Sequence, residues 1–344
     1  MSQSFPKSSV EPSPLLFMDA VNAYQRSAAI KAAVELDVFT HIAEGKTTAR
    51  ELAAACGAEE RGARILCDYL TITGFLSKQD GQYQLTQDSA VFLDKRSPAF
   101  LGGAIEFLLS PMLIEGFNNL TTAVRQGGTA LPEEGSIAPE HPVWVRFARA
   151  MAPMMAMPAQ SMAQLVKEQA PEGKLKVLDI AAGHGMFGIA VAKALPEADI
   201  TALDWPHVLE VAQENAQRAG VGERHHLLPG SAFEVDYGGP YDLILLTNFL
   251  HHFDTETCEQ LLRKVRAALK DEGKAVTLEF VPNEDRVSPA GAAMFSLVML
   301  GSTPRGDAYT FPELERMFKN AGFKRSTGHP LPNDYPQQIV ISEK

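Results

Sequence analysis

The chain has 344 residues, a length that suggests about two domains, and 45% apolar and 21% charged residues are ordinary for a globular protein. Its 31 basic and 42 acidic residues give a formal net charge of −11, which disfavours a protein that must hold the phosphate backbone of a nucleic acid. The three cysteines, at 56, 67 and 258, do not suit a disulfide framework or a cysteine-rich zinc site.

Targeting and membrane segments are not evident in the sequence. Residues 1–14 are rich in serine and proline, lack the apolar core of a signal peptide and predict a flexible lead-in. The longest apolar stretch, near 292–300, is far shorter than the roughly 20 residues that span a bilayer. We therefore expect a soluble, cytoplasmic protein without a membrane partner.

Residues 15–100 predict several helices followed by a β-hairpin. The pattern Thr48-Ala-Arg-Glu51 is a capping box at the start of a short helix, which Gly57 can end. A further helix is predicted over 64–73, and the Asp-Gly turn at 80–81 lies between apolar runs, as in a hairpin. Helix, turn, helix and hairpin together outline a winged helix.

A winged helix either binds DNA through the major groove or serves as a protein–protein module. A surface that contacts DNA should be distinctly basic. Residues 47–87 instead contain slightly more acidic than basic side chains. The basic ones are Arg50, Arg61, Arg64 and Lys78, and the acidic ones are Glu51, Glu59, Glu60, Asp68 and Asp80. The charge favours the protein–protein module, and we expect no nucleic-acid partner.

Residues 101–170 predict helices that connect the two parts of the chain, interrupted by a loop rich in glycine, proline and acidic residues at 127–142. Five methionines crowd the last part of this segment, at 151, 154, 155, 157 and 162. Methionine adapts to flat or irregular ligands, so this region could line a pocket. Simple filling of gaps in a core is an equally good interpretation.

Residues 171–344 alternate strand-like and helical segments. Apolar strand-like runs occur at 175–180, 200–203, 226–228, 241–246 and 275–280, with helical stretches at 186–195, 207–219 and 255–270. This alternation predicts an α/β fold with a doubly wound, Rossmann-like parallel sheet. Ligands of such sheets bind beyond the carboxyl ends of the strands, where the motifs described next also fall.

A glycine-rich turn follows the first of these strands. Gly183, Gly185 and Gly188 fit the pattern GxGxxG, and Asp204 follows the second strand 21 residues after Gly183. On spacing alone this is the fingerprint of a nicotinamide dinucleotide site. The same pattern fits S-adenosylmethionine (SAM), where the turn approaches the methionyl part and the acid accepts hydrogen bonds from both ribose hydroxyls.

Three neighbouring features favour SAM. Asp179 places an acid near the end of the first strand, where nicotinamide sites usually run directly from apolar residues into the glycines. A long helical part precedes the nucleotide-binding half. The fourth strand runs into the polar residues Thr247, Asn248, His251 and His252, where a transferred group would lie.

His251 and His252 are the candidates for the chemistry. Adjacent residues on an extended or turning backbone point in different directions, so we expect one ring to face the substrate while the other packs or caps. A metal site built on His-His-x-Asp is the alternative, but adjacent histidines rarely converge on one ion. Histidine generally titrates near neutrality, which suits a general base that acts on a phenolic hydroxyl.

Glu279, near the end of the fifth strand, is a candidate partner for the base. A carboxylate in this position can orient the imidazole ring and stabilise the imidazolium. An acid in an otherwise apolar strand costs free energy unless it is paired, which favours a functional role.

In combination, these motifs resemble the SAM-dependent O-methyltransferases of the plant caffeate type and their bacterial relatives in polyketide, phenazine and pigment tailoring. The resemblance covers nearly the whole chain and is carried by VLDIAAGHG, ALDWPHV, LPGSAFE, NFLHHFD, LEFVP and YTFPELERMFKNAGF. It implies a winged-helix-like dimerisation domain over about 15–100, pocket helices over 101–170 and a SAM-binding catalytic domain over 171–344. It also implies a homodimer.

The resemblance assigns roles to individual residues. His251 matches the catalytic base, Glu279 one of the two carboxylates that flank it, and Asp204 the ribose-binding acid. Residues 181–185 match the loop around the methionyl group and 231–233 the segment that contacts adenine. We expect the cofactor-binding set to be Asp179, Ala181, Gly183, Gly185, Asp204, Trp205, Ser231, Ala232, Phe233 and Asn248, with Trp205 packed against the nucleoside.

Several positions depart from the family pattern. Ala181 and Ala182 replace two glycines, Ser231 an aspartate, Thr247 a lysine and His252 an aspartate. The closing motif places Ala308 where the second flanking glutamate belongs. Asp307 is its neighbour and a candidate substitute, although it would point elsewhere on an unchanged backbone.

The sequence therefore predicts a SAM-dependent O-methyltransferase that acts on a hydroxyl of a small aromatic or polyketide-like molecule, releases S-adenosylhomocysteine (SAH) and needs no metal. One alternative is a SAM-binding member of the family with altered chemistry, such as hydroxylation, decarboxylation or C-methylation. Less favoured alternatives are an NAD-dependent oxidoreductase and a winged-helix regulator.

Overall fold

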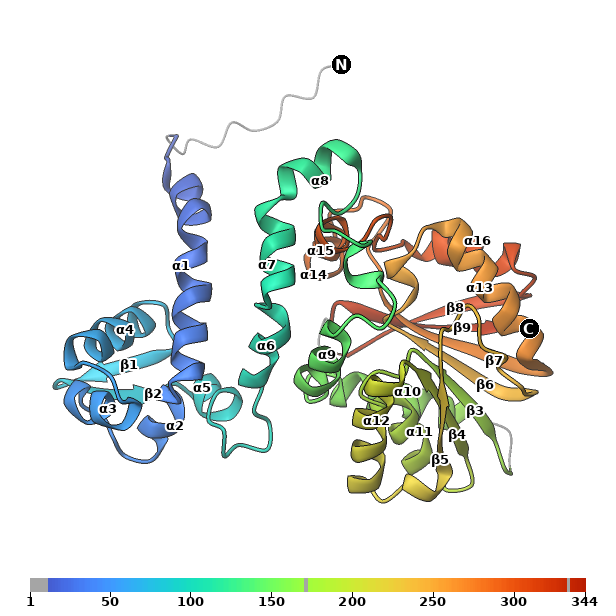
Figure 1. Cartoon of the computed structure of the whole chain (residues 1–344), viewed down its shortest axis with the longest axis horizontal. Helices are drawn as coiled ribbons and strands as arrows, with labels where there is room; N and C mark the ends of the chain where they lie inside the picture. The colour runs from blue at the N-terminus through green and yellow to red at the C-terminus, as the bar shows by residue number, and fades with distance from the viewer. Residues whose placement is uncertain (1–11, 170–172, 333–334) are drawn as a thin grey trace, which may run out of the picture. The chain divides into compact units, whose positions relative to one another are not determined.

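The computed structural model describes residues 12–169, 173–332 and 335–344. Most of the lead-in predicted over 1–14 lies outside these residues. The chain divides into two compact units between Gly103 and Ala104, so the helical segment predicted to connect two domains lies almost entirely within the unit that contains the large sheet (Figure 1). The two units are described separately.

The N-terminal unit contains the predicted helices and hairpin. Its elements are α1 Leu15–Glu35, α2 Val38–Ala43, α3 Ala49–Cys56, α4 Glu60–Ile72, β1 Leu76–Gln79, β2 Gln82–Leu85 and α5 Gln87–Phe92. The capping box is present, with the Thr48 side chain accepting from the Glu51 N–H, and Gly57 ends α3 at a φ of 64°. The helix expected from residue 64 begins one turn earlier, at Glu60.

Basic side chains near the hairpin are already paired with Asp68. Lys78 Nζ lies 2.6 Å and Arg64 Nη1 2.9 Å from its carboxylate, and the Tyr83 hydroxyl donates to it at 2.7 Å. These pairs reduce the positive charge that the hairpin region could offer to a phosphate backbone.

Helix α1 carries several exposed large apolar residues. Leu15, Leu16 and Phe17 retain 73%, 83% and 67% of their accessible surface, and Tyr24 retains 66%. A contiguous apolar surface of this kind marks a site of association.

The C-terminal unit begins with short helices and then forms the sheet. The helical part comprises a 3-10 turn at Gly102–Ala104 that crosses the boundary, α6 Ile105–Leu108, α7 Pro111–Asn118, α8 Leu120–Gln126, a 3-10 turn at Gly135–Ile137, α9 Val143–Met151 and α10 Ala156–Gln169. The predicted loop over 127–142 is therefore confirmed, apart from its one 3-10 turn.

The sheet has seven strands in the order β5-β4-β3-β6-β7-β9-β8. The strands are β3 Lys176–Ile180, β4 Asp199–Asp204, β5 His225–Pro229, β6 Tyr241–Thr247, β7 Leu269–Phe280, β8 Arg325–Pro330 and β9 Gln337–Glu343. The first five strands in this order are parallel, as predicted. The strands β8 and β9 were not predicted, and β9 runs antiparallel to both of its neighbours.

Helices cover both faces of the sheet (Figure 1). The helices that follow α10 in the chain are α11 Met186–Ala194, α12 Pro206–Arg218, α13 Thr255–Ala268, α14 Ala290–Ala293, α15 Phe295–Ser302 and α16 Phe311–Asn320, with 3-10 turns at Gly222–Arg224 and Leu250–His252. Alternate residues of β3 and β6 enter different cores, as the pleat requires. Leu178, Ile180, Ile244 and Leu246 pack with α13 and α16, whereas Val177, Leu243 and Leu245 pack with α10 and α11.

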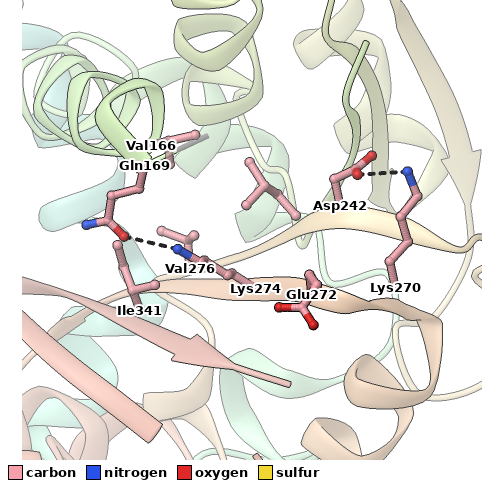
Figure 2. A pocket seen from close by; sticks show the side chains of 10 residues that line it. Val166, Gln169, Asp242, Lys270, Glu272, Lys274, Val276 and Ile341 are labelled. Atoms are coloured by element: carbon pink, nitrogen blue, oxygen red, sulfur yellow. Dashed lines mark hydrogen bonds and ion pairs between the residues drawn. The ribbon is translucent and has the colours of Figure 1, made fainter. Parts of the chain in front are cut away.

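A small hollow opens where β6 and β7 begin, at the amino-terminal edge of these strands (Figure 2). Asp242 pairs there with Lys270 at 2.7 Å, and Lys274 donates to Gln169 at 3.4 Å. The hollow is at the end of the sheet opposite to the carboxyl termini of the strands, so it is separate from the motifs identified in the sequence. No helix within the described part of the chain combines the length and apolar character needed to cross a membrane.

Candidate active site

The carboxyl ends of four adjacent parallel strands bring the predicted residues together. Ile180 of β3 lies level with Leu203 of β4 and Leu246 of β6, so the residues that follow these positions share one edge. Asp179 and Asp204 come from β3 and β4, whereas Thr247 and Glu279 come from β6 and β7. The topology therefore places both carboxylates of the glycine-rich motif beside the segment that carries the histidines.

Asp204 holds the glycine-rich turn through the backbone. Its carboxylate accepts hydrogen bonds from the N–H groups of Gly183 at 2.8 Å and Trp205 at 2.7 Å. Burial raises the pKa of this carboxyl group to about 6. A carboxylate has about four acceptor positions, so two remain for hydroxyl donors such as those of a ribose.

The turn itself has an unusual backbone. Ala181 adopts a φ of 54°, in the left-handed region where a side chain is strained, and Gly183 and Gly185 follow at 57° and 73°. The backbone is closed by a hydrogen bond from the Gly185 N–H to the Ala182 carbonyl at 2.8 Å. Alanine thus occupies a conformation that glycine would adopt without strain.

Asp179 lies beneath this turn and is completely buried. One carboxylate oxygen accepts from the Gly188 N–H at 3.0 Å, and the other has no partner within the described residues. Burial raises the pKa of Asp179 to about 7, with the nearby Asp204 contributing in the same direction. An unpartnered buried oxygen is costly and is a feature of ligand sites rather than of ordinary cores.

The segment 231–233 follows β5 at the same edge of the sheet. The Gly230 N–H donates to the Asp204 carbonyl at 3.0 Å, which ties this segment to the end of β4. The Ser231 hydroxyl accepts from the Phe233 N–H at 3.2 Å. The Ala232 carbonyl accepts from the Tyr237 hydroxyl at 2.6 Å, and the Phe233 ring stays 39% exposed.

Trp205 comes directly after Asp204 and begins α12. It packs against a small cluster formed by Ala148, Val208 and Val211. The contact joins the end of β4 to helix α9.

His251 and Glu279 form a buried pair. Nδ1 of His251 lies 2.5 Å from one carboxylate oxygen of Glu279, and the two side chains are only 4% and 3% exposed. The other oxygen accepts from the N–H groups of Phe249 at 3.0 Å and Leu250 at 2.8 Å. With Glu279 ionised, its carboxylate can only accept, which assigns the proton to Nδ1 and the lone pair of the ring to Nε2.

His252 is buried beside His251, but its contacts differ. The two ring centroids are 4.3 Å apart, so the expectation that adjacent histidines would point in different directions is wrong. The chain here is a 3-10 turn, in which adjacent Cα–Cβ bonds diverge by about 120°, so the two rings meet through the direction of their side chains and not through the backbone. Burial, and next the neighbouring His251, hold the pKa of His252 well below its usual range, so this ring stays neutral.

Aromatic rings surround the histidine pair. Phe295 meets the His251 ring edge-on at 4.8 Å and stacks on Phe280 at 3.8 Å between centroids. Trp144 meets the His252 ring edge-on at 5.2 Å. The side chains around His251 and His252 are therefore mainly planar, apolar rings.

Asn248 directly follows β6 and adopts a φ of 55°. Its backbone N–H donates to the Leu278 carbonyl at 2.8 Å, its side-chain oxygen accepts from Gln337, and its amide nitrogen lies 3.7 Å from the sulfur of Met155. Met162 is fully buried in the core that lies under α10 and α11. Met155 belongs to the same core, so the described contacts of both methionines fit the filling of gaps in a core.

No three histidine, cysteine or carboxylate side chains within residues 12–169, 173–332 and 335–344 lie together as a metal site requires. The Asp254 carboxylate, the third group of the His-His-x-Asp pattern, accepts instead from the Thr257 N–H at 2.9 Å and caps α13.

Comparison with known proteins matches both units of the chain. Residues 18–95 match the O-methyltransferase dimerisation domain, and residues 136–324, more than half of the chain, match the O-methyltransferase domain. The chain belongs to the O-methyltransferase family. The cofactor of this enzyme class is SAM, so the nicotinamide alternative is set aside.

Solved and characterised relatives of this methyltransferase agree with that assignment. A protein from Nostoc punctiforme, provisionally assigned as an O-methyltransferase, is 61% identical; the alignment covers 97% of this chain and all of that one, with a TM-score of 0.93. The 3-hydroxy-5-methyl-1-naphthoate 3-O-methyltransferase of Streptomyces sahachiroi is 27% identical over 90% of this chain and 89% of its own. Human N-acetylserotonin methyltransferase, solved with SAM, shares the fold at a TM-score of 0.84, with 22% identity and coverage of 98% and 99%.

The methyltransferase structure does not pair Asp307 with His251. Its carboxylate pairs with Arg286 at 3.1 Å and accepts from the Ala308 N–H at 2.8 Å. Ala308, the position at which the family resemblance places a second flanking glutamate, is fully buried.

Sequence reasoning missed the aromatic residues that the methyltransferase places around these motifs. The ring of Phe147, from α9, stacks on the His184 ring with 5.9 Å between the ring centroids. The same ring lies close to the turn, because a Cβ added at Gly183 would be 3.6 Å from it. Trp144 comes from the same helix, and its Nε1 donates to the Ser136 carbonyl at 2.9 Å. The spacing of three residues between Trp144 and Phe147, which places both rings on one side of a helix, was the available signal.

Proposed function

We propose that this methyltransferase transfers the methyl group of SAM to a hydroxyl of a small aromatic or polyketide-like acceptor, with His251 as the general base. The observation that carries the proposal is the buried His251–Glu279 pair, in which the carboxylate holds Nδ1–H and leaves the Nε2 lone pair available. This arrangement suits removal of a hydroxyl proton.

In the proposed reaction, Nε2 of His251 accepts the proton of the acceptor hydroxyl as its oxygen attacks. When bound, SAM supplies a methyl sulfonium, whose C–S bond breaks as the new C–O bond forms, leaving neutral SAH. Glu279 stabilises the positive charge that develops on His251, because its carboxylate is 2.5 Å away in a buried setting. His252, which stays neutral, adds no competing charge.

The residues at the strand ends fit the cofactor. Asp204 keeps free acceptor positions for two ribose hydroxyls. The bulky side chain of the turn 181–185, that of His184, is buried and stacks on Phe147, and the other residues of the turn are alanine or glycine. We assign Asp179 and Asn248 to the same site, since each adjoins that turn or the base. Ser231, Ala232 and Phe233 would meet the adenine, and Trp205 would lie beside the nucleoside.

The residues around the two histidines suit a planar, largely apolar acceptor molecule. Phe280, Phe295 and Trp144 present ring faces and edges around the two histidines. Such surfaces bind aromatic rings through apolar burial and edge-to-face contacts.

The experiment is methyl transfer from labelled SAM to a panel of hydroxylated aromatic compounds. Two probes are 3-hydroxy-5-methyl-1-naphthoate and N-acetylserotonin, after the names of the two characterised relatives. We expect His251→Ala to lose at least ~100-fold in turnover, the contribution of a positioned general base, while its affinity for SAH is unchanged. Normal turnover in that variant would remove the base assignment.

A second candidate function is altered chemistry at the same site, and the buried Ala308 favours it because the base lacks one flanking carboxylate. C-methylation or decarboxylation would keep the SAM site but yield a different product. Mass spectrometry with fragmentation of the product distinguishes an O-methyl ether from a C-methyl or decarboxylated compound.

We propose further that the chain forms a homodimer through residues 15–100. The match to a dimerisation domain and the exposed apolar side chains of α1 support this. Light scattering should give twice the chain mass, and introducing charge at Leu16 and Phe17 should yield a monomer.

A further inference from the structure

A tightly packed segment, residues 303–306, lies against the backbone of His251. Gly306 has no room for a side chain, because a Cβ there would lie 2.3 Å from the His251 carbonyl oxygen and 3.0 Å from the carbonyl carbon of His252. Its φ is outside the left-handed region, so backbone conformation does not demand glycine here. The close approach to the base is what excludes every larger residue.

Thr303 holds Gly306 in this position. Its hydroxyl is fully buried, accepts from the Gly306 N–H at 2.9 Å and donates to the Met299 carbonyl at 2.8 Å. Met299 belongs to α15, whose first residue, Phe295, meets the ring of His251. Helix α15 therefore contacts the base twice, at the ring directly and at the backbone through Thr303 and Gly306.

The end of α15 is itself fixed by the loop that follows α8. The Thr129 N–H donates to the Thr303 carbonyl at 2.8 Å, and the Thr129 hydroxyl donates to the Gly301 carbonyl at 2.7 Å. Gly128 packs so closely that a Cβ there would lie 2.1 Å from the Pro304 carbonyl oxygen. Thr303 thus belongs to a segment that cannot shift without disturbing its neighbours.

Glu279 fixes His251 from one side only. The family's second flanking carboxylate is replaced by Ala308, and Asp307 is engaged with Arg286. We propose that Thr303 is a positioning residue for the base: through Gly306 it fixes the His251 backbone and so keeps Nε2 aligned with the acceptor hydroxyl. The inference builds on the proposed role of His251.

Thr303→Val and Thr303→Ser test the hydroxyl. Valine keeps the shape but removes the partner of the Gly306 N–H, whereas serine keeps it. Ser302→Ala is a matched control, because its buried hydroxyl also donates one turn back, to Val298 at 2.7 Å, but does not contact Gly306.

We expect Thr303→Val to lower kcat by ~10-fold or more, since misplacing a catalytic group by a fraction of an ångström has effects of this size. The acceptor KM and the SAH affinity should stay within about twofold, because neither depends on base alignment. Thr303→Ser and Ser302→Ala should retain kcat close to that of the natural protein. Equal losses in Thr303→Val and Ser302→Ala would mean general loosening of α15 and would overturn the proposal.

A second readout does not depend on turnover. In protein labelled with ¹⁵N-histidine, the Nδ1–H resonance of His251, identified by its loss in His251→Ala, reports the geometry of the bond to Glu279. We expect it to move in Thr303→Val and to stay in place in Ser302→Ala. An unmoved resonance together with unchanged kcat in Thr303→Val refutes the positioning role. If the natural protein methylates none of the probes, that result challenges the proposed function. In that case the resonance still decides this inference.

Discussion

The two halves of the active site are built differently. The cofactor half is made of residues that directly follow β3, β4 and β5, and it is held by backbone N–H groups donating to Asp204 and Asp179. The base half joins segments far apart in the chain, with Trp144 from α9, His251 from the 3-10 turn that follows β6, Glu279 from β7 and Phe295 from α15. Local sequence therefore specifies the first half, whereas the packing of distant helices specifies the second.

The largest expected effect is that of Glu279→Gln, which should affect only the base half. The glutamine oxygen can still accept from Phe249 and Leu250, but its amide group would then face Nδ1 of His251. That ring would adopt the other tautomer, with the proton on Nε2, and could no longer act as a base. We expect kcat to fall by ~1000-fold, as for loss of a carboxylate that sets a catalytic tautomer.

Calorimetric titration with SAH is the control for Glu279→Gln. Affinity within about twofold of that of the natural protein would show that the two halves act independently. A comparable loss in SAH affinity would mean that the Glu279 carboxylate also supports the cofactor site, and the comparison drawn above would fail.

Asp204→Asn should have the opposite effect. The asparagine amide group cannot accept, so the side chain loses partners among the Gly183 N–H, the Trp205 N–H and the ribose hydroxyls. Charge-assisted hydrogen bonds contribute about 1.5–3 kcal/mol, so we expect SAH affinity to fall by ~10- to 100-fold. With SAM at saturation, kcat should be nearly that of the natural protein, and a large fall there would contradict the separation of the two halves.

The pH dependence of SAH binding sharpens the same comparison. Burial raises the pKa of Asp204 to about 6, and hydroxyl donors bind the ionised carboxylate, so SAH affinity should rise as the pH increases through about 6 and fall below it. At most, the change is tenfold per pH unit. Titrations between pH 5 and pH 8 measure it.

Asp204→Asn is also the control for that pH profile. Asp179, whose pKa burial raises to about 7, titrates in an overlapping range. If the dependence persists in Asp204→Asn, Asp179 is its source. A flat profile in the natural protein would show that neither carboxyl group changes its protonation when SAH binds.

The sequence predicted the parallel part of the sheet and the elements around the glycine-rich turn, because apolar runs and turn residues are local signals. It did not predict β8, since Arg325–Pro330 has no apolar alternation, and it missed β9, which pairs with strands from elsewhere in the chain. Antiparallel pairing at this edge depends on contacts that no local pattern contains.

The site shows the same limit. Glu279 was expected beside His251 because an acid in an apolar strand needs a partner, and the two side chains do meet. The role of Arg286 as partner of Asp307 was not accessible, because it depends on how separate segments pack. The meeting of the His251 and His252 rings was not accessible either, because adjacency in the chain does not fix the direction of a side chain. The spacing of Trp144 and Phe147 placed both rings on one side of a helix, but it could not tell which motifs that side contacts. Ala308 was recognised only through the family resemblance.

The smallest expected effect concerns the cofactor turn, at Ala181→Gly. Ala181 has a φ of 54°, where an L side chain costs about 1 kcal/mol, whereas glycine loses about 0.4–1 kcal/mol more conformational entropy on folding. The two terms nearly cancel, leaving about 0–0.6 kcal/mol in favour of glycine, or roughly 0–2 °C in the midpoint of thermal unfolding. Gly185→Ala is the matched reversal: at a φ of 73° its Cβ would lie 3.1 Å from that of Ala212, so we expect a loss of about 1–2 kcal/mol. If Ala181→Gly instead weakens SAH binding while stability is unchanged, the strained alanine must hold the turn in its binding conformation. Glycine would give the backbone of the folded turn more conformational freedom before the cofactor binds, and binding would then have to remove that freedom.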